Sequence, residues 1–324
     1  MPAVTTVRRS TRLAHGVHSA RPAHSAHQSR SSRDLRRTCS MPLLTDAHGH
    51  LQADRFNDDY QQVAARARDA GVVRLLIPSY GIESSEGAFR IAPDLPWADL
   101  AIGIHPYTAV TDAPGRDALL ARATDPRVVA IGETGIDTKR DFAPLAAQIE
   151  NLEAHIDVAA ALGKPLILHC RSLGDGDESQ RQLLATLRSS AIGAPGGAKA
   201  FGGRVPFILH SASGSAAYVE EALALGGAVS ISGLAFRPEE SATGEWVALI
   251  PPDRLLTETD APWLTMPGAP DPHRNEPANV ALTLAWIAER RGEPIEPLAR
   301  AIAENYDRIF PRDATLPPRL ELAL

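Results

Sequence analysis

Short apolar runs alternate with segments of helical periodicity eight times along this chain of 324 residues. The runs are rich in aliphatic residues, and each is followed by a polar loop and then a helix-like segment. Their positions are 43–47, 72–78, 98–104, 128–132, 165–169, 205–209, 227–231 and 254–257. Strands that alternate with helices form a parallel sheet with right-handed crossovers. Eight such units in about 270 residues predict a single α/β domain of the (β/α)8 barrel type.

The predicted helices occupy the intervals between these runs. The clearest covers 144–162, where Leu145, Ile149 and Leu152 recur at three- and four-residue steps and Gly163 ends the helix. The others are predicted at 57–70, 83–91, 114–123, 178–189, 214–225, 242–249, 277–291 and 295–308. An open doubly wound sheet is the competing architecture, but the chain has no Gly-rich dinucleotide or P-loop fingerprint to support it.

The first forty residues differ in composition from the rest. Residues 1–40 hold eight Arg, no Lys, one acid and no hydrophobic period. Such a segment buries too little apolar surface to offset its ordering entropy, so we expect a disordered basic tail followed by one barrel domain at 41–324. The Arg/Ser-rich character is also similar to an organelle transit peptide. Met41 directly precedes the first run, and it is the alternative natural start that would leave 1–40 as upstream sequence.

Charge and hydropathy restrict the kinds of partner. Residues 41–324 carry 25 basic and 38 acidic side chains, a net charge of −13, which argues against broad wrapping of duplex nucleic acid. A site that captures one phosphate end through bound cations remains compatible with this charge. No run reaches the ~18 apolar residues of a membrane span, and two cysteines exclude a disulfide scaffold. We expect a cytoplasmic, monomeric protein without membrane association.

Polar residues follow most of the apolar runs. In a barrel, the chemistry lies at the carboxyl ends of the strands. Five of the seven histidines outside the tail occupy such ends, the exceptions being His155 and His273. The residues at these ends are His48 and His50 after the first run, His105 after the third, Glu133 and Asp137 after the fourth, His169 and Arg171 after the fifth, His210 after the sixth, and Glu258 and Asp260 after the eighth.

This set indicates metal chemistry. His48 and His50 are two positions apart on a strand, so they point to one side and can bind one cation together. Imidazole and carboxylate ligands suit Zn, Mn, Co or Mg, and a carboxylate such as Glu133 can bridge two of them. Two cations ~3.5–4 Å apart activate a shared water and hold a phosphate oxygen. Asp260 can ligate a metal and accept the proton of that water.

Each of these histidines taken alone is more often a packing or hydrogen-bonded residue than a ligand. The joint pattern at consecutive strand ends predicts a centre with two divalent metal ions of unspecified identity. Cys170 lies beside His169, but strand alternation turns its side chain to the opposite face, where packing is the favoured role.

Around these residues the chain resembles the TatD family of metal-dependent deoxyribonucleases, within the amidohydrolase-like barrels. The resemblance runs in family order from Thr45 to Phe310. It is carried by TDAHGHLQADRF, AIGIHPY, AIGETGID, QIENLEAHIDVAAALGKPLILHCR, LHSASGS, ISGLAF, LLTETDAPWL, RNEPANV and NYDRIF.

The resemblance implies a TIM barrel with divalent metals that hydrolyses phosphodiester bonds in DNA, often as a 3′–5′ exonuclease on single strands. Water activated by the metals would attack a phosphorus at a DNA 3′ end, and Asp260 would take the proton. His105, Arg171 and Arg274 are the candidates for binding the phosphate. The implied metal ligands are His48, His50, Glu133, His169, His210 and Asp260, of which Glu133 and Asp260 are also the expected catalytic residues.

Departures from the family pattern leave the substrate open. Ala212 and Thr138-Lys139-Arg140 stand where members commonly carry aromatic residues, 172–180 is acidic and Gly-rich, and 191–203 has the composition of an insertion. One alternative is an ester or amide hydrolase of the deacylase type, which the acidic body and the missing aromatics favour mildly because stacking helps to hold single strands. A binding module without activity is the other, and the intact ligand set argues against it.

Overall fold

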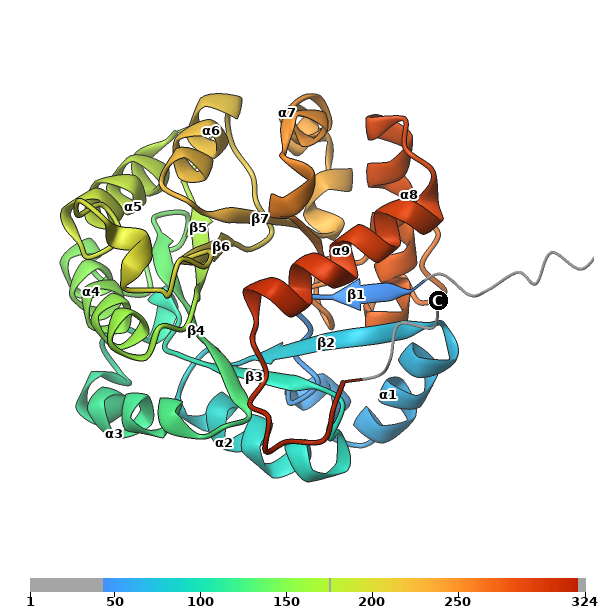
Figure 1. Cartoon of the computed structure of the whole chain (residues 1–324), viewed down its shortest axis with the longest axis horizontal. Helices are drawn as coiled ribbons and strands as arrows, with labels where there is room; N and C mark the ends of the chain where they lie inside the picture. Colours follow the sequence, from blue (N-terminus) through green and yellow to red (C-terminus); the bar gives the residue numbers. More distant parts are fainter. Residues whose placement is uncertain (1–42, 175, 320–324) are drawn as a thin grey trace, which may run out of the picture. The chain divides into compact units, whose positions relative to one another are not determined.

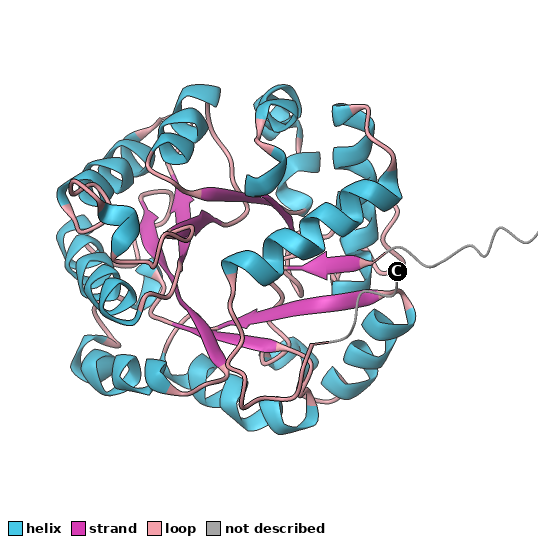
Figure 2. Ribbon diagram, in the orientation of Figure 1, coloured by secondary structure: helices cyan, strands magenta, loops and turns pink. Residues whose placement is uncertain are grey.

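The computed structural model describes residues 43–174 and 176–319, and within this range it confirms the predicted barrel. Eight strands follow one another in sequence order, and each is parallel to its neighbour (Figures 1 and 2). They are β1 (Leu44–Asp46), β2 (Val72–Pro78), β3 (Asp99–Ile102), β4 (Val128–Asp137), β5 (Leu166–Arg171), β6 (Phe207–Leu209), β7 (Ala228–Ile231) and β8 (Leu255–Thr257). The predicted disordered tail at 1–40 lies outside the described residues.

Helices surround the ring of strands (Figure 2). They are α1 (Tyr60–Asp69), α2 (Ile82–Ile91), α3 (Arg116–Ala121), α4 (Leu145–Leu162), α5 (Glu178–Ser189), α6 (Ala216–Ala224), α7 (Ser241–Trp246), α8 (Val280–Arg291) and α9 (Ile295–Ile309). The predicted helix at 242–249 is split into α7 and a 3-10 turn at Val247–Leu249. Within the described part of the chain, no helix combines the length and the apolar character needed to cross a membrane.

The first and last strands close the barrel. The amide of Ala47 donates to the carbonyl of Thr257 over 2.9 Å. Just beyond the strand ends, the amide of Asp260 donates to the carbonyl of His48 over 2.8 Å. Closure therefore places the residues that follow β8 directly beside those that follow β1.

Strand β4 is longer than the sequence predicted. It continues past residue 132 to Asp137, because pairing with β5 resumes after a register shift, with Thr134 opposite Leu168. Gly135 has φ +144, and a Cβ at this position would clash with the carbonyl of His169. Glycine therefore allows β4 to approach β5 closely at this point. Glu133 and Asp137 are strand residues rather than loop residues.

Helix α9 and the segment after it cover the amino ends of the strands (Figure 1). Asp99, the first residue of β3, is 1% exposed and accepts hydrogen bonds from Arg312 (2.6 Å), Arg319 (2.7 Å) and the Tyr306 hydroxyl (3.0 Å). Asn305 donates to the carbonyl of Leu255 at the start of β8. These contacts tie the end of the chain to the face opposite the strand ends that carry the predicted site.

We predict that Asp99→Ala lowers the free energy of unfolding by about 3–5 kcal/mol, because it leaves the largely buried Arg312 guanidinium without a carboxylate and removes one of the two carboxylates that pair with Arg319. Denaturant titration followed by circular dichroism measures the change. Asp253→Ala is the control: its carboxylate forms an exposed pair with Arg254, and we expect a loss below about 1 kcal/mol. Equal effects of the two substitutions would contradict the role assigned to Asp99.

Candidate metal centre

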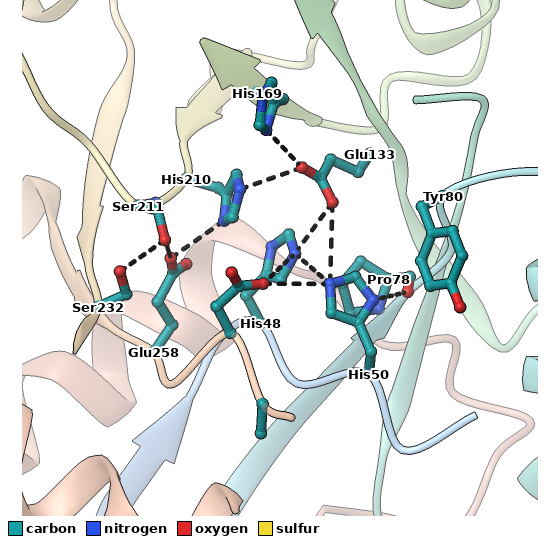
Figure 3. A network of polar contacts seen from close by, with 12 residues as sticks. His48, His50, Pro78, Tyr80, Glu133, His169, His210, Ser211, Ser232 and Glu258 are labelled. Atoms are coloured by element: carbon teal, nitrogen blue, oxygen red, sulfur yellow. Dashed lines mark hydrogen bonds and ion pairs between the residues drawn. The ribbon is translucent and has the colours of Figure 1, made fainter. Parts of the chain in front are cut away.

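A first group of donor atoms gathers where β1 and β8 end. The Nε2 atoms of His48 and His50 lie 3.0 Å apart (Figure 3). Oε2 of Glu133 lies 3.3 Å from Nε2 of His48 and 3.8 Å from that of His50. Oδ1 of Asp260 lies 3.7 Å and 3.3 Å from the same two nitrogens. Two imidazoles and two carboxylates therefore converge on one point.

A second group forms around the other oxygen of Glu133. Oε1 lies 2.9 Å from Nδ1 of His169, 3.1 Å from Nε2 of His210 and 3.4 Å from Nε2 of His105. The two oxygens of this one carboxylate thus face different sets of histidines, as Figure 3 shows for His48, His169 and His210. This is the arrangement of a carboxylate that can bridge two cations.

Three of the rings are oriented by an acceptor behind them. When the outer nitrogen of a neutral imidazole carries the hydrogen and donates it, the inner nitrogen keeps a free lone pair for a metal. The acceptors are the carbonyl of Pro78 for His50 (2.9 Å), Glu258 for His210 (3.1 Å) and Asp137 for His169 (2.9 Å). The inner nitrogens of these rings all face the Glu133 carboxylate, and that of His50 also faces Asp260.

The charges of the cluster fit a divalent cation. Burial by itself would lower the pKa of His210, but Glu133 and Glu258 outweigh it and raise that pKa to about 10. Burial likewise opposes ionisation of Glu133, and the surrounding histidines still hold its pKa well below the usual range. Among the described residues, the buried Nδ1 of His48 has no hydrogen-bond partner. The carboxylates require positive charge between them, and the donor set is one that Zn, Mn or Co prefers.

His105 differs from the other rings although it also lies close to Glu133 and His169. Its Nδ1 accepts the amide hydrogen of Tyr107 over 3.1 Å. Burial lowers the pKa of His105 to about 4, so the ring is neutral and its one hydrogen is on Nε2. A protonated nitrogen cannot ligate a metal. His105 therefore presents a hydrogen-bond donor to the centre.

Helix α4 holds the backbone in front of His105. Nε2 of the buried His155 accepts the amide hydrogen of Ile104 over 3.0 Å, and Asn151 donates to the carbonyl of the same residue over 2.7 Å. His155 is thus a buried residue of α4 that fixes the backbone of Ile104, the residue before His105.

The cluster lies in a pocket of about 740 Å³ at the carboxyl ends of the strands. Five basic side chains also line this pocket: Arg55, Lys139, Arg140, Arg171 and Arg237. Within the described residues, none of the five forms an ion pair with a carboxylate; Arg171, for example, donates to Ser213 over 3.0 Å. The entrance to the centre is therefore locally positive in a domain whose net charge is negative.

Arg274, the third predicted phosphate contact, does not line this pocket. Its guanidinium makes two hydrogen bonds of 2.9 Å to Asp59 and one of 3.1 Å to Glu276. The structure brings together the other eight predicted site residues and leaves Arg274 paired with acids beside them.

Sequence reasoning assigned no role to four residues around the centre. Asp137 and Glu258 were visible as polar residues near strand ends, and the structure places each behind a histidine. Tyr107 and Trp263 carried no signal of their own, although both stand within motifs that hold site residues, GIHPY and TETDAPW. Both line the pocket.

A (β/α)8 barrel with histidines and carboxylates converging at the carboxyl ends of its strands defines a metal-dependent hydrolase of the amidohydrolase-like class. A model of the TatD related DNase family matches residues 45–311, and the chain belongs to this family. It is thus an enzyme of the hydrolase class.

Individual relatives agree with this assignment. The 3′-5′ ssDNA/RNA exonuclease TatD of Citrobacter rodentium is 34% identical over 266 residues, which are 81% of this chain and 95% of that protein. The protein of the same description from Klebsiella pneumoniae is 33% identical over 266 residues, with the same coverage. The crystal structure of YjjV, a TatD homolog from Escherichia coli K12, superposes with a TM-score of 0.70 at 26% identity, covering 84% of this chain and 99% of that one.

We predict that replacing both His48 and His50 by alanine removes most bound divalent metal and leaves the fold intact. Two donors of the first group are lost, whereas barrel stability comes from the packed interior. Elemental analysis after metal loading gives the metal content, and circular dichroism reports the fold. His273→Ala, an exposed histidine at the pocket, is the control that keeps its metal. Wild-type metal content in the double variant would contradict the ligand assignment.

Proposed function

We propose that this chain hydrolyses phosphodiester bonds at the 3′ ends of single-stranded nucleic acid with the help of two divalent metal ions. The observation that carries the proposal is the division of the Glu133 oxygens between two histidine groups, inside a pocket lined by five basic side chains that form no ion pair among the described residues. Relatives about 34% identical are described as 3′-5′ ssDNA/RNA exonucleases, which supports the same substrate class here.

The donor groups assign the ligands. His48, His50 and Asp260 would hold one cation, His169 and His210 would hold the other, and Glu133 would bridge them. When bound, the cations lower the pKa of a water molecule and neutralise charge on the phosphate. The side chain of Asp260 is 15% exposed and lines the pocket, so its carboxylate can accept the proton that the attacking water releases.

The phosphate is held by residues that do not serve as ligands. His105 directs its Nε2 hydrogen toward the centre and can donate it to a phosphate oxygen. Arg171 lines the pocket from the end of β5, and its bonds to Ser213 and to the Cys170 carbonyl both use Nη1. The remaining donors of its guanidinium are available to the substrate.

Pocket size and charge distribution select among substrates. A volume of about 740 Å³ is that of a small-ligand site, which fits the terminal nucleotide of a strand. The unpaired cations at the entrance attract a polyanion and offer nothing to a neutral ester. This local field favours nucleic acid over the ester or amide hydrolase that the sequence also allowed.

The proposal is tested with the protein loaded with Mn²⁺, Mg²⁺, Zn²⁺ or Co²⁺ in parallel. Each form is incubated with single-stranded oligonucleotides labelled at the 5′ or the 3′ end, with the matching duplex, and with a panel of carboxylic esters and amides. We expect 5′-labelled single strands to shorten stepwise from the 3′ end. Rapid hydrolysis of an ester or amide with intact oligonucleotides would overturn the proposal in favour of the deacylase alternative.

We predict that Asp260→Asn lowers kcat by about 10²–10⁴-fold and changes KM little, because asparagine keeps one ligating oxygen but accepts no proton at neutral pH. Steady-state kinetics on a single-stranded oligonucleotide measure both constants. Asp117→Asn, an exposed aspartate in α3, is the control with unchanged kcat. Near-normal turnover in the Asp260 variant would show that this carboxylate is not the base.

A further inference from the structure

An aromatic pair stands at the edge of the pocket on the β3 and β4 side. The ring centroids of Tyr107 and Phe142 lie 4.7 Å apart in an edge-to-face arrangement. Tyr107 is fixed because its hydroxyl donates to Asp137 over 2.9 Å. Phe142, which contacts Tyr107, is 59% exposed, whereas large aromatic side chains are mostly buried. An aromatic face is therefore held open to solvent next to the centre.

Two unpaired cations flank this aromatic pair. Lys139 and Arg140 lie on the same loop as Phe142, and neither forms an ion pair among the described residues. The loop is held in place because Oδ1 of Asp137 accepts both of their backbone amides, at 2.8 Å and 3.0 Å. The Arg140 guanidinium lies 5.9 Å from the Tyr107 ring centroid. An aromatic surface with adjacent free cations matches the base and the phosphate of one nucleotide.

The position of Phe142 shows which nucleotide this is. Tyr107, Lys139 and Arg140 line the pocket, whereas Phe142 lies outside the lining. A terminal nucleotide that enters the pocket leaves its neighbour at the entrance. We propose that Tyr107, Phe142, Lys139 and Arg140 form a subsite for the nucleotide on the 5′ side of the scissile bond. Its base stacks on Phe142, and its phosphate binds Lys139 and Arg140. This inference rests on the proposed exonuclease function.

The subsite favours single-stranded over duplex substrates. Stacking on one aromatic ring tolerates any base, so the subsite selects strand state rather than sequence. In a duplex both faces of an internal base are covered by its neighbours, and only an unpaired, flexible strand can offer a base to Phe142.

The test compares a decathymidylate with the methyl ester of thymidine 5′-monophosphate, which has the terminal nucleotide and neither a 5′ neighbour nor an aromatic leaving group. We expect Phe142→Ala to raise KM for the oligonucleotide by about tenfold more than KM for the ester. Phe142→Trp keeps a stacking surface and should restore the oligonucleotide KM. Leu249→Ala, which removes another exposed apolar side chain away from the pocket lining, is the control that leaves the ratio unchanged.

An abasic nucleotide beside the scissile bond isolates the stacking contact. Placed on the 5′ side of that bond, it should raise the wild-type KM about as much as Phe142→Ala does on the normal strand. Because both changes remove the same contact, Phe142→Ala should raise KM little further on the abasic strand. Replacing Lys139 and Arg140 together by Gln should raise the oligonucleotide KM and flatten its dependence on salt, whereas Arg204→Gln, an exposed arginine, should not.

The outcomes separate the two proposals. If the wild-type enzyme shortens oligonucleotides but Phe142→Ala affects normal and abasic strands equally, or raises KM for the ester as much as for the decathymidylate, the subsite is wrong and the function stands. If the wild-type enzyme shortens no oligonucleotide in any metal, both proposals are overturned. Thermal unfolding of each variant shows whether a change in KM reflects loss of the fold; the high exposure of Phe142 predicts an unchanged melting temperature.

Discussion

The junction between β1 and β8 is the contact on which the centre depends. The buried carboxylate of Asp46, at the end of β1, accepts the amide and the hydroxyl of Thr259 at 2.9 Å and 2.7 Å. Burial raises the pKa of Asp46 to about 8 even with these bonds. The neighbouring backbone bond from Asp260 to His48 aligns a carboxylate with two histidines more than two hundred residues earlier in the chain. Without barrel closure the first group of donors would not exist.

Burying this many ionisable groups is unfavourable unless their charges are compensated. Glu133, Glu258 and Asp137 each face at least one histidine, so each of these buried carboxylates has an imidazole partner. The carboxylates behind His169 and His210 also determine which ring nitrogen points inward. The same contacts that make the cluster tolerable in the folded protein thus prepare it to bind cations.

Substrate choice depends on the loops rather than on the ligands. The same donor set would activate water for attack on an ester, an amide or a phosphodiester, so the ligands do not distinguish these substrates. The difference here lies in the unpaired basic side chains of the pocket, which give an acidic domain a locally positive entrance. Asp137 connects the predicted ligands with the loop. One of its oxygens faces His169, and the other accepts the backbone amides of Lys139 and Arg140.

The sequence by itself determined the eight strand–helix units and which polar residues stand at the strand ends, because hydrophobic period and strand-end position are local properties. It also indicated the family. Only the tertiary structure decided that β4 extends to Asp137, that the oxygens of Glu133 face different histidines, and that His105 presents a donor. Arg274 shows why: its charge is taken up by Asp59, a residue 215 positions away in sequence. Which charges pair and which ring nitrogen carries a hydrogen depend on neighbours that only the closed barrel brings together.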